Sequence, residues 1–135
     1  MRYVFALLSL GLFGCTGSTL GTAASVEPAN FPVVTTGEVV DLTSMLLEKT
    51  VTVFDFYAEW CPPCKKLDLS LKDLKSVYGD KLQVYKLDIV NWDSALAKHH
   101  GIRDLPYLIV YDGLEIMGQG PSNQVLGNLV TRLNR

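Results

Sequence analysis

The amino-acid sequence predicts an α/β domain in which a central mixed β-sheet is flanked by helices on both faces. The first observation is residues 51–57, an apolar, β-branched and aromatic run that suits a strand buried on both faces. The second is the helical spacing of leucines after Cys64, and the third is the continued alternation of strand-like and helix-like segments. From residue 51 onward the predicted order is β-α-β-α-β-β-α.

Length, composition and net charge limit the class of protein to which this chain can belong. The chain has 135 residues, of which 48% are hydrophobic and 19% are charged. These values suit one globular domain of ordinary size with a short additional segment, and a monomer is expected. The formal net charge is −2, which gives no indication of a nucleic-acid partner.

The N-terminal segment resembles an export signal. Residues 1–14 start with Met-Arg and continue as an apolar run too short to span a bilayer but suited to a signal peptide. The run ends in Leu-Phe-Gly before Cys15, which is similar to the lipobox of bacterial lipoproteins and implies a lipid on Cys15. An ordinary signal peptide cleaved after Ala24 is the competing interpretation. Either event would account for the third cysteine, which lies outside the Cys61/Cys64 pair.

The rest of the chain divides into a tether and a domain. Residues 15–36 are rich in Thr, Ser, Ala, Gly and Pro and are predicted to be a lipid-anchored tether, in which residues 31–34 could pack as an edge segment. The domain is predicted at residues 37–135. This arrangement places the protein outside the cytoplasm, on the periplasmic side of a bacterial membrane.

Each element of the domain has its own signal. A short strand or turn at 37–42 and a helix capped by Asp41 or Thr43 are expected before residue 51. The helix after Cys64 buries Leu67, Leu71, Leu74 and Tyr78, ends at Gly79, and carries Lys65, Lys66, Asp68, Lys72 and Asp73 mainly on its wetter faces. A strand is expected at 82–89, followed by a helix that starts at Asn91 or Asp93, runs to Lys98 and is ended by Gly101. Two strands at 106–111 and 114–119 are joined by a turn at 112–113. The last helix is capped by Ser122 and has Leu126, Leu129, Val130 and Leu133 on one face.

The strand at 51–57 delivers two cysteines to the start of a helix. If Cys61 is the N-cap, Pro62 and Pro63 occupy the first helical positions, where proline loses little because those N–H groups lack helical partners. The Cys64 amide can then point at the Cys61 sulfur, and the helix dipole adds positive potential. Both effects favour the thiolate, so Cys61 should be the reactive cysteine, with Cys64 one turn away to close a disulfide.

Two plainer interpretations of the cysteine pair remain open. One is a purely structural disulfide. The other is half of a zinc site, which would need about four ligands. Outside the pair only Cys15, His99 and His100 are soft candidates, and the adjacent histidines are more simply helix-end residues. No metal is therefore expected, and the only redox group is the Cys61–Cys64 couple itself.

The chain resembles the thioredoxin family over roughly residues 37–135. The family's Trp-Cys-x-x-Cys-Lys pattern is present as Trp60, Cys61, Cys64 and Lys65, its strand acid and neighbouring lysine match Asp55 and Lys86, and Gly101 to Tyr107 is similar to the segment that ends in its cis-proline. The resemblance implies a thioredoxin fold with a cis peptide before Pro106. It also implies a substrate surface formed by Trp60, Pro62, Pro63, Leu105 and Pro106, although partial core packing is an equally simple interpretation of Trp60 and Tyr57.

Asp55 is difficult to explain by packing alone. An unpaired carboxylate in a buried strand is costly, and burial should raise its pKa while a nearby Lys86 ammonium opposes the rise. The resemblance implies that Asp55 takes the proton from Cys64 when that thiol attacks a mixed disulfide. An edge-exposed or merely salt-bridged acid is the alternative.

These observations predict a thiol–disulfide oxidoreductase that acts mainly as a disulfide reductase on protein substrates. Re-reduction outside the cytoplasm implies an electron donor, by family analogy a membrane thiol–disulfide transporter. A dithiol oxidase is the first rival, because potentials in this fold span about −270 to −120 mV. The second rival is a metallochaperone or another non-catalytic module that uses the fold for docking.

Overall fold

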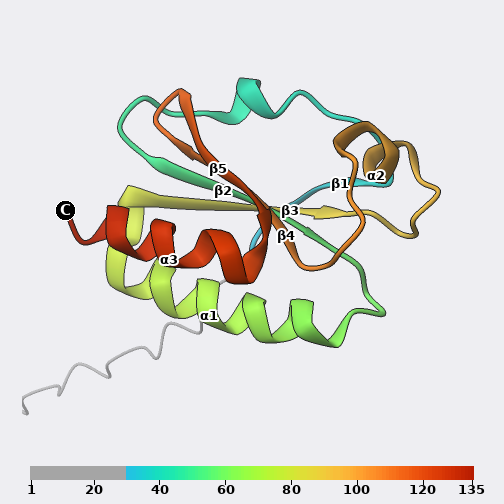
Figure 1. The fold of residues 1–135 in the computed structure, drawn as a ribbon. Helices are drawn as coiled ribbons and strands as arrows, with labels where there is room; N and C mark the ends of the chain where they lie inside the picture. Colours follow the sequence, from blue (N-terminus) through green and yellow to red (C-terminus); the bar gives the residue numbers. More distant parts are fainter. Residues whose placement is uncertain (1–29) are drawn as a thin grey trace, which may run out of the picture.

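The structure is a computed structural model that describes residues 30–135. The predicted signal peptide, Cys15 and most of the predicted tether lie outside the described residues. The core of the domain is a five-stranded sheet in the order β1-β3-β2-β4-β5 (Figure 1). The strands are β1 (Val33–Thr36), β2 (Val51–Tyr57), β3 (Leu82–Asp88), β4 (Tyr107–Asp112) and β5 (Glu115–Pro121). The α-helices are α1 (Pro62–Tyr78), α2 (Ala95–His100) and α3 (Ser122–Leu133), and the short 3-10 helices are η1 (Leu42–Met45) and η2 (Gly79–Lys81).

The central strand is β2, and it determines the mixed character of the sheet. It pairs in parallel with β3 on one side and antiparallel with β4 on the other. All seven of its residues are buried, which confirms the prediction of a strand covered on both faces. The β2–β3 register places Asp55 opposite Lys86, and paired residues of parallel strands point to the same face of a sheet.

Helices cover both faces of the sheet, as the sequence predicts. Helices α1 and α3 lie on one face, and α2 and η1 lie on the other (Figure 1). The α1/α3 side of the core contains Val53, Leu67, Leu71, Leu108 and Leu129 among others, and the opposite side contains Phe54, Phe56, Leu87, Ile89 and Leu96. Within residues 30–135 no helix combines the length and the apolar character that crossing a bilayer requires.

The sheet starts earlier in the chain than the predicted domain boundary at residue 37. Val33–Thr36 forms β1 and pairs in parallel with β3, and Phe31 joins the core. The short strand considered at 37–42 is absent, because Gly37 turns the chain with a φ of 79°. By contrast, the edge segment expected at residues 31–34 is confirmed, and the domain boundary was predicted too late because an edge strand buries few side chains: of the four residues in β1, only Thr35 is buried.

One predicted helix is shorter than expected, and two others start differently in the structure. The helix expected to be capped by Asp41 or Thr43 is only the single turn η1, and Asp41 is its cap. Helix α2 is capped by Ser94, because Asn91 instead accepts a hydrogen bond from the Asp93 amide and closes a local turn. Ser122 is the first residue of α3 and does not cap it with its side chain. Several polar residues in a row compete for each cap, and tertiary packing selects among them.

Candidate active site

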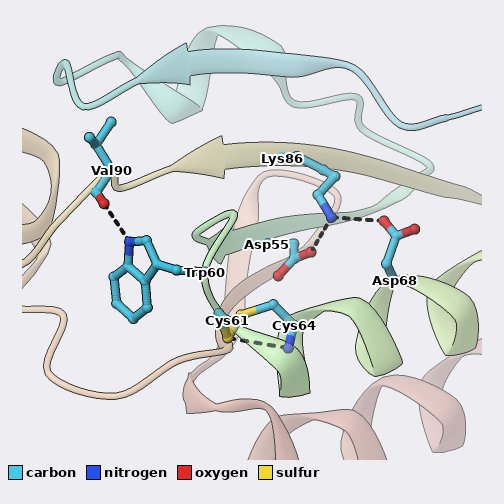
Figure 2. Close-up of a disulfide and its surroundings, with 7 residues drawn as sticks. All are labelled: Asp55, Trp60, Cys61, Cys64, Asp68, Lys86 and Val90. Carbon is cyan, nitrogen blue, oxygen red and sulfur yellow. Dashed lines mark hydrogen bonds and ion pairs between the residues drawn. A yellow bond between two sulfur atoms is a disulfide. The ribbon is translucent and has the colours of Figure 1, made fainter.

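The Cys61–Cys64 pair lies where β2 passes into α1, as predicted. Cys61 is the N-cap of α1, and its sulfur accepts a hydrogen bond from the Cys64 amide at 3.3 Å. Pro62 and Pro63 occupy the first two helical positions, so neither contributes an N–H group that competes for that sulfur. The two cysteines form a disulfide (Figure 2), with Cα atoms 5.4 Å apart.

The oxidised pair is buried in the domain. Cys61 is 4% exposed and Cys64 is 2% exposed, and both belong to the core cluster that contains Phe56 and Ala58. When the bond is reduced, the amide of Cys64 and the positive end of α1 are placed to stabilise a negative charge on the Cys61 sulfur. The arrangement therefore suits reversible opening of the disulfide with Cys61 as the nucleophile.

Asp55 is fully buried on β2, which excludes the edge-exposed alternative. Its Oδ2 lies 3.4 Å from the Lys86 ammonium, an ion-pair distance, yet neither carboxyl oxygen has a hydrogen-bond partner among residues 30–135. Burial raises the pKa of the Asp55 carboxyl to about 6, although the Lys86 charge opposes the rise. A carboxyl group with this pKa can release and accept a proton near neutral pH.

Asp68 on α1 belongs to the same cluster and was not predicted to be part of the site. It was expected on a wet face of the helix, but its side chain is only 20% exposed and bonds Lys86 at 2.8 Å and Lys72 at 2.9 Å. Burial acts against ionisation of this group, but the hydrogen bonds from both lysines keep the pKa of Asp68 below its usual value. The signal was present in the sequence: Cys64, Asp68 and Lys72 follow at intervals of four residues and share one helix face.

A pocket of about 510 Å³ opens beside this cluster. Its lining includes Cys64, Tyr57, Asp68 and Lys86, so it connects the second cysteine and the lysine with solvent. The Lys86 ammonium lies 4.2 Å from the centre of the Tyr57 ring, in a cation–π contact. Burial and nearby carboxylates raise the pKa of Tyr57 to about 12, so this phenol stays neutral.

Two tryptophans are exposed close to the cysteines. Trp60 is 52% exposed and donates from Nε1 to the Val90 carbonyl at 2.7 Å (Figure 2). Trp92 is 45% exposed and meets the Trp60 ring edge to face at 5.5 Å. Both rings thus remain available on the surface, whereas Tyr57 is buried.

The remaining predicted positions are also placed by the fold. The Leu105–Pro106 peptide bond is cis, as the resemblance implied, and Leu105 packs against the core cluster that contains both cysteines. His100 packs on Phe56 at 4.9 Å, and burial together with the neighbouring His99 lowers the pKa of His100. Across residues 30–135 no three His, Cys, Asp or Glu side chains are grouped to hold a metal ion.

A redox disulfide at the start of the helix that follows the central strand, with a buried carboxyl group behind it, defines a thiol–disulfide oxidoreductase. The thioredoxin family model matches residues 34–132, and the chain belongs to that family.

Known proteins support the assignment over most of the domain. A thioredoxin of Buchnera aphidicola subsp. Schizaphis graminum is 34% identical in an alignment of 86 residues that covers 59% of this chain and 79% of that protein. Thioredoxin C-2 of Corynebacterium nephridii is 31% identical over 71 residues, and the match spans 65% of its length. A solved thioredoxin from Halobacterium salinarum has the same fold, with a TM-score of 0.55 and 24% identity over 82% of this chain and 96% of that one.

Proposed function

We propose that the protein is an extracytoplasmic disulfide reductase that donates electrons from Cys61 and Cys64 to disulfides of protein substrates. The observation that carries this proposal is the bond from the Cys64 amide to the Cys61 sulfur at the positive end of α1, directly after the buried strand that holds Asp55. The thiolate of Cys61 is stabilised there, and the thiolate is the form that attacks a disulfide.

The reaction divides into two exchanges. The Cys61 thiolate attacks one sulfur of the substrate disulfide, a mixed disulfide forms, and the other substrate sulfur leaves as a thiolate. Cys64 then loses its proton to Asp55 and attacks the Cys61 sulfur, which gives the Cys61–Cys64 disulfide and releases the second substrate thiolate. The substrate gains two electrons and the cysteine pair loses two, so an external dithiol must reduce the pair again.

The environment of Asp55 favours the reductase direction. In the view of Figure 2 its carboxyl group lies between the Lys86 ammonium and the disulfide. A base that ionises near neutral pH helps the step in which Cys64 resolves the mixed disulfide. By family analogy the electron donor is a membrane thiol–disulfide transporter.

Insulin reduction by the purified domain, combined with a glutathione redox titration, tests the proposal. We expect activity in the wild type, none in Cys61→Ser, and a trapped mixed disulfide in Cys64→Ser, because that variant can attack but cannot resolve. A reduction potential of about −270 mV for the Cys61–Cys64 pair supports a reductase, whereas a reduction potential of about −120 mV would indicate a dithiol oxidase. Failure to exchange thiols at any potential would favour a non-catalytic binding module or metallochaperone.

We also propose that a lipid on Cys15 anchors the domain to the periplasmic side of a bacterial membrane. The basis is the apolar run of residues 1–14 with its lipobox-like end, followed by a stretch rich in small and polar residues. Labelled fatty acid should enter the wild type and not Cys15→Ser. Equal labelling of the two proteins would contradict the anchor, and an N-terminus mapped after Ala24 would establish ordinary signal cleavage instead.

A further inference from the structure

We propose that Asp68 is a positioning residue of the redox centre: it holds the Lys86 ammonium away from Asp55 and so keeps the Asp55 carboxyl group ready to receive the proton of Cys64. The proposal deepens the proposed function and rests on it for the role of Asp55. Asp68 itself need not touch the reacting sulfurs. It acts through the lysine that the two carboxylates share.

The distances show which carboxylate holds the lysine. Lys86 Nζ donates a hydrogen bond to Asp68 Oδ1 at 2.8 Å, whereas its 3.4 Å contact with Asp55 Oδ2 is an ion pair without a hydrogen bond (Figure 2). The second oxygen of Asp68 is held by Lys72 at 2.9 Å, one helical turn further along α1. Asp68 is therefore fixed from two sides, and Lys86 is drawn toward the helix and the solvent side of the cluster.

Few other charges act on Asp55. On β3 the facing residue is Lys86, and on the other side β4 presents the apolar Leu108. From α1 come Asp68 and, as the reacting group, Cys64, while on β2 itself Tyr57 is neutral up to a pKa of about 12. The charge state of Asp55 is thus determined by its burial, by one shared cation and by one neighbouring anion.

The effect of Asp68 on Asp55 has two parts with the same sign. Its negative charge directly disfavours a second negative charge on Asp55, and it is among the causes that raise the Asp55 pKa, after burial. By accepting the hydrogen bond of Lys86 it also prevents a closer contact that would stabilise the Asp55 carboxylate. Both parts favour the protonated form of Asp55, which is the form that must follow the deprotonation of Cys64.

The pocket beside the cluster provides the exit for that proton. Cys64, Asp68 and Lys86 all line it, and Lys86 is 11% exposed. A proton taken from Cys64 by Asp55 must leave before the next turnover, and the pocket gives water access to Lys86, which lies 3.4 Å from Asp55. The relay breaks the S–H bond of Cys64 and forms an O–H bond on Asp55, and that O–H bond breaks again when the proton passes to water. No atom changes its oxidation state in these proton transfers.

The test is a carbon-13 NMR titration of the Asp55 carboxyl group in the oxidised protein, which requires no turnover. In Asp68→Asn we expect the titration midpoint to fall by about one pH unit, a tenfold loss of proton affinity. Asp73→Asn removes the same charge from an exposed site on the same helix and should leave the midpoint unchanged. Asp68→Glu should restore most of the wild-type value, and Asp68→Ala provides a second neutral variant if the asparagine protein folds poorly.

The sign of the shift decides the outcome. A midpoint that rises in the neutral variants would show that Asp68 holds Lys86 close to Asp55 and so stabilises the Asp55 carboxylate. An unchanged midpoint would show that Asp68 has no influence on the Asp55 pKa. Either result overturns the proposal. If the midpoint falls as expected but the pH profile of insulin reduction stays at its wild-type position, the coupling is real and the role of Asp55 in turnover is wrong. The two hypotheses therefore fail separately.

Discussion

Two carboxylate–cation pairs in this domain differ in their exposure to solvent and in their hydrogen bonding. Arg132 on α3 binds both oxygens of Asp112 at the end of β4, one of them through Nη2 at 2.8 Å, and the two side chains are 39% and 37% exposed. Asp55 is fully buried, lies 3.4 Å from a lysine that bonds another acid, and has no hydrogen bond among the described residues. In the exposed pair, both Asp112 oxygens accept hydrogen bonds from Arg132, at a place where water could also supply them. The buried Asp55 carboxyl group has no such bonds among the described residues, at a place removed from solvent.

The comparison indicates that the ionised Asp55 carboxylate lowers the stability of the fold. A surface ion pair contributes little because water screens it and competes for both partners. A buried carboxyl group that ionises without hydrogen bonds destabilises the fold, and its pKa rises as a result. In Figure 2 the Asp55 carboxyl group lies beside the redox disulfide, a location that suits a proton acceptor better than a purely structural residue.

The largest expected effect is on the pH dependence of stability around Asp55. Its pKa is raised from 3.8 to about 6 in the folded state, so the folded protein binds the proton more tightly than the unfolded chain. The resulting stabilisation is complete below about pH 3.8 and is lost as the pH rises through about 6. The loss amounts to about 3 kcal/mol, and Asp55→Asn should not show it.

Denaturant unfolding of the oxidised wild type and of Asp55→Asn, measured from about pH 3.5 to 8, gives the difference directly. The asparagine variant should gain stability relative to the wild type as the pH rises. Parallel pH profiles for the two proteins would mean that Asp55 is hydrated or well paired in solution.

A much smaller effect is expected for the exposed pair. Arg132→Gln removes the cation from Asp112, and we expect only a slight loss of unfolding free energy, which should disappear in about 1 M salt because the pair is screened there. The hydrogen bond and charge of Asp112 raise the pKa of Arg132, so the guanidinium stays charged over the pH range in which the protein is folded. Titration of Arg132 should therefore not change the contribution of this pair to the free energy of unfolding. A loss comparable to the Asp55 effect would show that hydrogen-bond geometry outweighs exposure.

Much of the fold and the cysteine pair at the centre of the site could be predicted from local sequence patterns. The alternation of elements from residue 51, the buried central strand and the helix start at Cys61 were all predicted, because each depends on neighbours within a few residues. The edge segment expected at residues 31–34 is present as part of β1, but the extent of that strand and the Ser94 cap were not predicted, because a short edge strand has no periodicity of its own and adjacent polar residues compete for one cap.

By itself the sequence determined which groups can react: two cysteines three residues apart, with two prolines between them and an acid on the preceding strand. Only the tertiary structure decided how the charges are shared, because Asp68 and Lys86 are 18 residues apart and meet only when α1 packs on β3. The physical reason is that short-range geometry follows from local bonding, whereas the partner of a buried charge depends on which surfaces the fold brings together.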